Sequence, residues 1–303
     1  MTLEETMTIA ALMLAPAFFS LIGMAAFGSP IVALLGELAA KSKSKVFYDK
    51  YGQQTASMGV IVLILLTLVQ AVGIALLITK YPQHADQVMA QQATFIPIFA
   101  AAGAYLLFGL PYLLLWKKMR NSKGMHIALG IAASIGAISM VALVIPAKLS
   151  FTFEGGTVAP EISALFLPMS IMYAIMIIVA AAGLSCAWLI MRRNKDDFGR
   201  DYYNFSFPLA ARWAFIPMIG FLACQGWLFT VLPETMKTMV TGTPLGIVWA
   251  IGAGLSLLCA IIWLLIARSQ TPLRLKGLAF LAVLLMWLAH TANVVVFFNF
   301  MSM

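Results

Sequence analysis

Apolar runs near the length needed to cross a lipid bilayer recur along almost the whole of this chain. A membrane-spanning helix needs about 20 predominantly apolar residues, and the sequence offers runs near or above that length eight times. In lipid the backbone must satisfy its own hydrogen bonds, so each run is predicted to be a helix. A β-barrel is excluded because its strands would alternate polar and apolar residues. The predicted spans cover residues 9–39, 57–79, 94–116, 125–147, 162–191, 212–232, 244–267 and 277–299.

The composition agrees with a polytopic all-α membrane protein. Of 303 residues, 62% are hydrophobic and 10% are charged, whereas soluble domains carry about 25% charged residues. The net charge of +8 does not indicate a nucleic-acid partner, because the excess sits in short loops on one side of the membrane. The cysteines lie in apolar runs without metal-ligand spacing, so they are predicted to be buried thiols: Cys186, Cys224 and Cys259.

The loops predict the orientation. Sixteen of the 19 basic residues fall in, or directly beside, the loops after the first, third, fifth and seventh spans, and only Lys80, Lys148 and Lys237 fall on the other side. Positively charged loops stay on the cytoplasmic side. Both termini are therefore predicted to lie outside, which is the periplasm in a bacterium, and the first run has no basic n-region that would mark it as a cleaved signal peptide.

A basic, aromatic segment occurs twice and divides the chain. Residues 41–51 and residues 192–203 have this character, and an apolar run follows each. Aligning the two segments places Phe47–Tyr48 on Tyr202–Tyr203, and Gln70 on Gln225.

The chain is therefore predicted to contain two tandem four-helix bundles. The first covers residues 1–150 and the second residues 151–303. Because each half has an even number of helices, the repeat is parallel, unlike the inverted repeats of many transporters.

Polar groups deep in a membrane are costly and need a reason. His290 lies in the eighth span, and Asn293, three residues later, is predicted to share its face of the helix. Imidazole is the usual axial ligand of a b-type haem iron and also hydrogen-bonds a quinone carbonyl. A structural histidine that only satisfies its neighbours is the alternative.

Three further residues are candidates for a quinone or cofactor site. Gln70 and Gln225 are single polar residues near the middle of their spans. Either they hydrogen-bond between helices, or they bind a cofactor between the bundles. Arg212, at the inner start of the sixth span, is predicted either to line a head-group or quinone slot or to snorkel to the interface.

Other polar and aromatic residues are predicted to have interfacial roles. Glu37 is expected to reach water or to pair with a lysine of the loop that follows it, and His126 to lie at the inner mouth of the fourth span. The aromatic residues of the repeated segments are assigned to the interfacial belt: Tyr48, Tyr51, Tyr202 and Tyr203. The spans carry no buried carboxylate near their middle, which weighs against active proton or cation transport.

The segment from Val46 to Gly59 resembles the one that joins the first two helices of cytochrome bd oxidase subunit I-like proteins. The resemblance implies two four-helix bundles with the N-terminus outside. That family carries a haem-ligating histidine near positions 25–27 and another in the fifth helix, but this chain has none at 25–27 or between Glu161 and Arg193. The long quinol-binding loop is also missing, so oxygen reduction at a haem d site is not expected.

A second resemblance is to the haem-free, quinone-interacting membrane anchors of polysulfide-reductase type, which share the eight-helix plan. Both resemblances imply an inner-membrane subunit of a respiratory electron-transfer complex. It would link the quinone pool to a partner such as a cytochrome c or an iron–sulfur protein, with at most one b-type haem at His290. The alternatives are a transporter with a parallel four-plus-four repeat and a membrane anchor without a cofactor.

Overall fold

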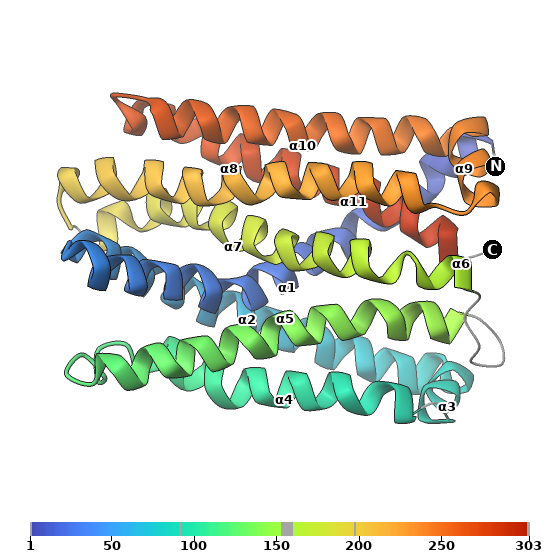
Figure 1. Cartoon of the computed structure of the whole chain (residues 1–303), viewed down its shortest axis with the longest axis horizontal. Helices are drawn as coiled ribbons and strands as arrows, with labels where there is room; N and C mark the ends of the chain where they lie inside the picture. The colour runs from blue at the N-terminus through green and yellow to red at the C-terminus, as the bar shows by residue number, and fades with distance from the viewer. Residues whose placement is uncertain (1, 91, 153–159, 197, 302–303) are drawn as a thin grey trace.

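The computed structural model describes residues 2–90, 92–152, 160–196 and 198–301, and these residues form helices and short connections without a strand (Figure 1). Within these described residues, eight helices are long and apolar enough to cross a membrane. In chain order they are α1 (Leu3–Lys43), α2 (Val46–Lys80), α4 (Gln92–Leu114), α5 (Lys123–Thr152), α7 (Phe166–Asp196), α8 (Arg200–Val231), α10 (Leu245–Arg268) and α11 (Lys276–Met301).

Short helices connect some of these spans. They are α3 (Pro82–Ala90), α6 (Pro160–Ser163), α9 (Glu234–Gly242) and the 3₁₀ turn η1 (Pro272–Leu275). In both predicted halves a short helix, α3 or α9, separates the second long helix from the third, and the second half also contains α6 and η1. The tandem repeat and its boundary at residue 150 stay predictions, and the junction over residues 153–159 lies outside the described part of the chain.

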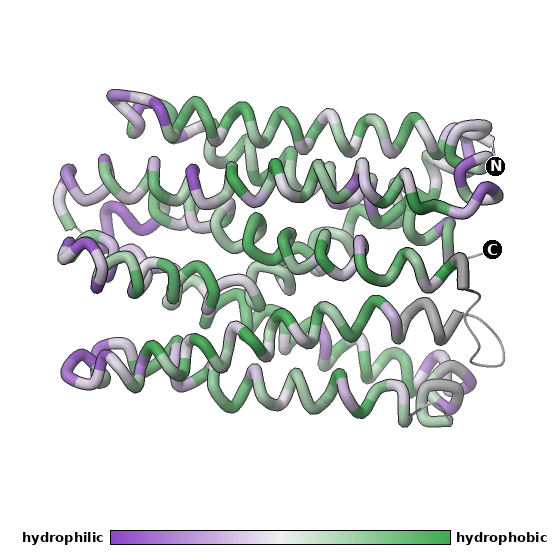
Figure 2. The backbone as a smooth tube through the Cα atoms, viewed as in Figure 1, coloured by the Kyte–Doolittle hydropathy of each residue, from purple (hydrophilic) through white to green (hydrophobic). Residues whose placement is uncertain are grey.

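The predicted all-α membrane class and the eight spans are confirmed. Figure 2 shows hydrophobic residues along the middle of the long helices and hydrophilic residues at their ends. Several helices are longer than predicted. α1 begins at Leu3 because Thr2 and Glu5 form a reciprocal capping box, which satisfies backbone N–H groups that the first turn leaves unpaired.

The two basic, aromatic segments were expected to be loops, and this expectation is wrong. They contain the last residues of α1 and α7 and the first turns of α2 and α8, and the connections between these helices are only a few residues long. Their tyrosines were assigned to the interfacial belt, but Tyr51 and Tyr202 are fully buried, and Tyr48 and Tyr203 nearly so.

These buried tyrosines join the two halves. The hydroxyl of Tyr51 lies 2.7 Å from Oγ of Ser185 on α7, and the Tyr202 hydroxyl donates to Oε1 of Gln54 at 2.6 Å. Gln54 in turn donates to Asp196 at 2.7 Å. Aromatic rings that could have faced lipid head groups are used instead to pack α2 against α7 and α8.

Helices α1 and α7 lie at the centre, where each contacts α5 and α11 as well as the other (Figure 1). Gly28 of α1 makes the close approach possible, because a Cβ there would collide with the backbone carbonyl of Ile177 and lie 2.9 Å from Cβ of Ala181. Without a hydrophobic driving force in lipid, helices associate through such small residues, which let the backbones pack closely.

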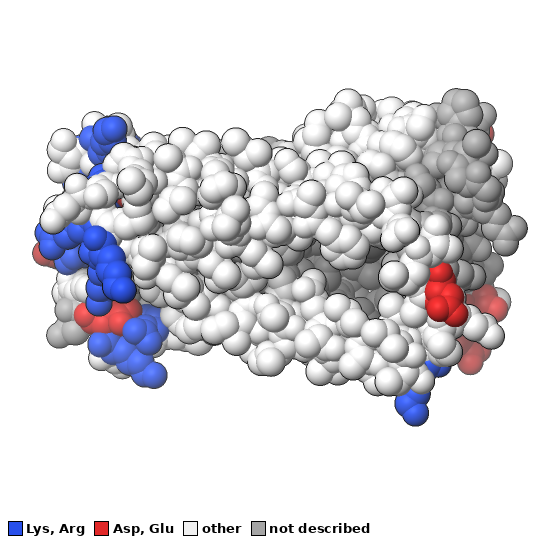
Figure 3. Space-filling view, turned by 90° about the horizontal axis from the view of Figure 1, so that it is seen from below, with Lys and Arg blue, Asp and Glu red and all other residues white. Residues whose placement is uncertain are grey.

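Charge is segregated to the two ends of the bundle. Figure 3 shows Lys and Arg gathered at one end, where α1 joins α2, α4 joins α5, α7 joins α8 and α10 joins α11; we call this the basic end. The chain termini lie together at the opposite end (Figure 1). The assignment of the basic end to the cytoplasmic side follows from the positive-inside rule and stays a prediction.

Candidate functional site

His290 lies beside a cavity between α1, α5, α7 and α11, in the part of these helices nearer the chain termini. Its side chain is 2% exposed, and Nε2 lies 3.1 Å from the hydroxyl oxygen of Ser20 on α1. The cavity has a volume of about 490 Å³. It therefore lies at the central junction of the bundle, with contributions from both predicted halves.

The cavity is apolar apart from a few hydrogen-bonding groups. Its aliphatic, aromatic and methionine lining comes from these four helices and from Leu66 of α2, and its polar side chains among the described residues are Ser20, Tyr173 and His290. Ser20 is exposed, and Phe298, which also lines the cavity, is 41% exposed. The cavity is therefore open towards the lipid-facing surface.

This lining does not fit a b-type haem. The two propionates of a haem are carboxylates, which are costly to bury without cationic partners, and none of the lining residues within the described part of the chain is Lys or Arg. Nε2 of His290, the expected ligand atom, is within hydrogen-bond distance of Ser20. A quinone fits better, because it is neutral, has two carbonyl acceptors and carries an apolar tail.

Gln225 and Asn293 belong to a separate, satisfied network. Nε2 of Gln225 donates to Oδ1 of Asn293 at 3.1 Å, and Nε1 of Trp249 donates to Oε1 of Gln225 at 3.0 Å. The network ties α8 and α10 to α11. The predicted polar patch of His290 and Asn293 is therefore divided, because these side chains reach α1 and α8 respectively.

The expected equivalence of Gln70 and Gln225 is wrong. Gln225 is 5% exposed, whereas Gln70 is exposed on α2. Gln70 is not among the residues that line the His290 cavity. The alignment of the two segments thus placed both residues on corresponding helices but did not give the direction in which each side chain points.

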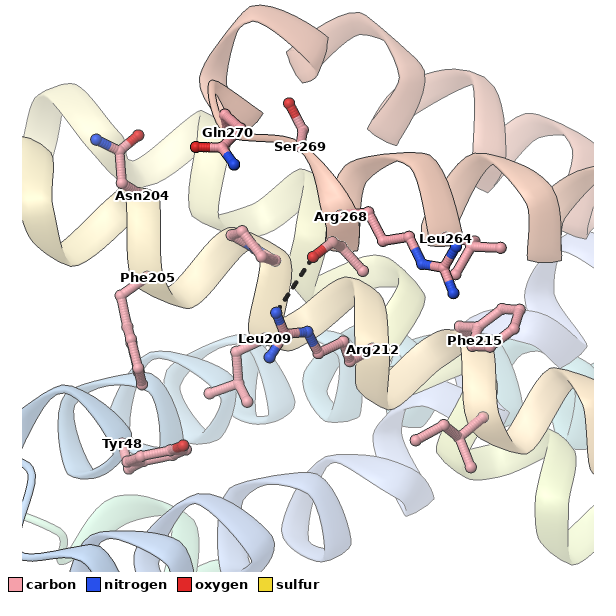
Figure 4. A pocket seen from close by; sticks show the side chains of 13 residues that line it. Tyr48, Asn204, Phe205, Leu209, Arg212, Phe215, Leu264, Arg268, Ser269 and Gln270 are labelled. Atoms are coloured by element: carbon pink, nitrogen blue, oxygen red, sulfur yellow. Dashed lines mark hydrogen bonds between the residues drawn. The ribbon is translucent and has the colours of Figure 1, made fainter.

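Arg212 lines a groove of about 860 Å³ at the basic end, between α8 and α10 and beside the start of α2 (Figure 4). Its guanidinium donates to the backbone carbonyl of Ala267 at 3.3 Å. A groove therefore lies where a slot was predicted, and its use for a head group or a quinone stays a prediction. It is distinct from the His290 cavity, because the two share no lining residue.

A buried ionic cluster at the basic end was missed. Glu37 and His126 are 2% and 1% exposed, and Nδ1 of His126 lies 2.9 and 2.8 Å from the two carboxylate oxygens of Glu37. Lys123, at the start of α5, lies 3.3 Å from the same carboxylate and also pairs with Asp49. The Tyr112 hydroxyl donates to Glu37 at 3.4 Å.

This cluster corrects two expectations. His126 is buried rather than interfacial, and the lysine that pairs with Glu37 comes from α5 rather than from the loop after α1. One signal was available in the sequence: Glu37 and His126 lie at the same predicted depth, at the inner ends of two spans of one half. Opposite charges at one depth of a bundle are expected to pair.

The comparisons with known proteins concern the fold. No family model and no curated protein matches the sequence. Among solved structures, the chain is similar to the bd oxidase from Geobacillus thermodenitrificans, with a TM-score of 0.72 and 12% sequence identity over 98% of this chain and 87% of the other. The predicted resemblance to cytochrome bd oxidase is thereby confirmed at the level of the fold.

Proposed function

We propose that this chain is an integral membrane subunit of a respiratory electron-transfer complex and binds a quinone or quinol in the His290 cavity. The observation that carries the proposal is the cavity itself, an apolar space at the central helix junction with a hydrogen-bonding edge at His290 and Ser20. The shared fold with a bd oxidase supports a place in the respiratory chain.

The roles of the residues follow from their chemistry. His290 and Ser20 would hydrogen-bond a ring oxygen of the quinone, and Tyr173 lies in the same lining. The apolar residues from α5 and α7, among them Val141 and Met169, would surround the ring and the first part of its tail. The quinone supplies the redox chemistry, and the chain supplies position and a low-dielectric environment.

A haem at His290 is not part of the proposal, because the lining does not fit one. Electrons would therefore pass between the quinone and a cofactor of a partner subunit, a cytochrome c or an iron–sulfur protein. We place the complex in the cytoplasmic membrane with the termini of this chain outside, since the basic end is the side expected to stay in the cytoplasm.

The two other functions fit less well. A transporter would be expected to have discontinuous helices that meet near the middle of the membrane, but the described spans are continuous. A membrane anchor without a ligand was expected to have Gln70, Gln225 and His290 hydrogen-bonded to one another, with no cavity. Gln70 is exposed instead, and a cavity lies beside His290.

Quinone retention tests the proposal. The chain is purified in mild detergent, its lipids are extracted, and the quinone content per chain is measured beside that of His290→Ala. Without its histidine the cavity loses a hydrogen-bonding group that contributes about 1–3 kcal/mol to binding, so retention should fall by about 5- to 150-fold.

Gln70→Ala is the matched control, because it removes a polar side chain at a similar depth but outside the cavity, and it should retain quinone normally. If His290→Ala does not fold, Ser20→Ala tests the same edge from α1, where the side chain is exposed. Equal quinone contents in the wild type and in a folded His290→Ala or Ser20→Ala variant would show that the cavity is not the site.

A further inference from the structure

The groove at Arg212 is lined by both arginine side chains and apolar side chains. Arg212 and Arg268 lie on its two sides, from α8 and α10, and both side chains are exposed. Among the described residues that line it, none is Asp or Glu. The groove is therefore a cationic site with no carboxylate of its own to neutralise it.

Polarity changes along the groove in the direction of the membrane. Figure 4 shows Asn204, Ser269 and Gln270 on one side of the view, and Phe215 and Leu264 on the other. On α8, Phe215 is almost one turn further from the basic end than Arg212, and on α10, Leu264 is one turn before Arg268. Along both helices the arginine therefore stands nearer the end of the bundle than the apolar residue, and the Arg268 guanidinium extends back to lie beside Leu264 (Figure 4).

A ligand that matches this arrangement must be anionic at one end and apolar at the other. The groove lies at the end of the bundle where basic residues gather (Figure 3), which is the depth of the lipid head groups. Basic pockets between membrane helices on the cytoplasmic side are a recognised binding place for anionic lipid head groups. Guanidinium groups bind phosphate oxygens through paired N–H donors.

We infer that this groove binds an anionic phospholipid, with its phosphate at Arg212 and Arg268 and an acyl chain against Phe215, Ile216 and Leu264. Arg212 uses one of its five N–H donors on the Ala267 carbonyl. This bond holds the side chain in place and leaves its other donors for a ligand. The inference concerns a different site from the His290 cavity and holds whether or not quinone binds there.

Native mass spectrometry of the detergent-solubilised chain tests this inference. Phosphatidylglycerol is titrated against the wild type and the variant Arg212→Gln/Arg268→Gln, with phosphatidylcholine as the zwitterionic comparison lipid. Each arginine near a membrane surface contributes about 1 kcal/mol to binding of anionic lipid, so the double variant should bind phosphatidylglycerol at least about tenfold more weakly. Phosphatidylcholine should bind weakly to both proteins.

The matched control is Lys117→Gln/Lys118→Gln, which removes the same charge from exposed positions at the basic end but outside the groove. It should bind phosphatidylglycerol like the wild type. Arg268→Gln alone tests the same groove if the double variant does not fold, because it leaves the Arg212–Ala267 hydrogen bond in place.

Three results would overturn the inference. The first is an equal loss of binding in the lysine control, which would mean that general charge rather than the groove attracts the lipid. The second is equal binding of phosphatidylcholine by the wild type. The third is full displacement of phosphatidylglycerol by an equal concentration of inorganic phosphate, which would show that the apolar wall contributes nothing.

Discussion

Oε2 of Glu37 lies 2.8 Å from Nδ1 of His126, although the two residues are 89 positions apart in the chain. Nε2 of the same imidazole lies 3.0 Å from the backbone carbonyl oxygen of Tyr112. A carbonyl only accepts, so Nε2 must donate. The contact between Nδ1 of His126 and the Glu37 carboxylate then contains one proton, carried by either group. Together with the Tyr112 carbonyl, the pair joins α1 to α5 and to the last turn of α4.

Removing only one member of this pair should lower the free energy of unfolding. His126→Leu leaves the Glu37 carboxylate buried with fewer partners, and breaking a buried ion pair in this way costs about 3–5 kcal/mol. The double variant Glu37→Met/His126→Leu should recover most of that loss, because it removes both polar groups together. Unfolding free energies from denaturant titration in mixed micelles measure both effects.

An exposed pair provides the comparison. Nζ of Lys237 lies 2.9 Å from Oε1 of Glu234, and the Glu234 side chain is 86% exposed. Glu234→Gln should therefore lower the free energy of unfolding by less than about 1 kcal/mol. A His126→Leu variant as stable as this control would mean that the pair does not hold the helices together.

Gln225 and Gln70 offer a second matched comparison. Gln225→Leu would remove the acceptor of Trp249 and the donor to Asn293, and buried polar groups left without partners cost about 1–3 kcal/mol. Gln70→Leu changes an exposed residue and should stay within about 0.5 kcal/mol of the wild type. Thermal unfolding in detergent ranks the two variants, and equal Tm values would contradict the network.

Gly28 should be intolerant of even a methyl group. In Gly28→Ala the new Cβ collides with the Ile177 carbonyl, so α1 and α7 must separate at their crossing. Overpacking of this kind costs about 1–3 kcal/mol, and the backbone contact places this variant at the upper end. Gly73→Ala is the control, because a Cβ there meets nothing within 4 Å; it should be neutral or slightly stabilising.

Hydropathy predicted where the spans lie but not which side of each helix is buried. The eight spans follow from run length, because lipid requires every spanning segment to be an apolar helix. The direction of each side chain could not be predicted. In a soluble helix a 3.6-residue period marks the buried face, but here the lipid-facing and core-facing residues are both apolar. Gln70 and Gln225 therefore looked alike, although only Gln225 is buried.

The burial of the aromatic residues at the helix ends could not be predicted for a different reason. A tyrosine beside lysines suits both a lipid interface and a buried helix start, and composition does not separate the two. The packing of Tyr51 and Tyr202 between the halves depends on partners more than a hundred residues away, Ser185 and Gln54. Such contacts follow from the tertiary fold, as the pairing of Glu37 with His126 does.

The absorption spectrum of the purified chain separates the two cofactors that His290 was predicted to bind. A haem would need partners for two propionates, and the described residues that line the cavity beside His290 include no Lys or Arg. We therefore expect a reduced-minus-oxidised spectrum without a b-type band, a pyridine haemochrome assay without stoichiometric haem, and quinone in the lipid extract of the same sample. One haem per chain in the wild type, lost in His290→Ala, would instead establish His290 as an axial ligand and refute the argument from the lining.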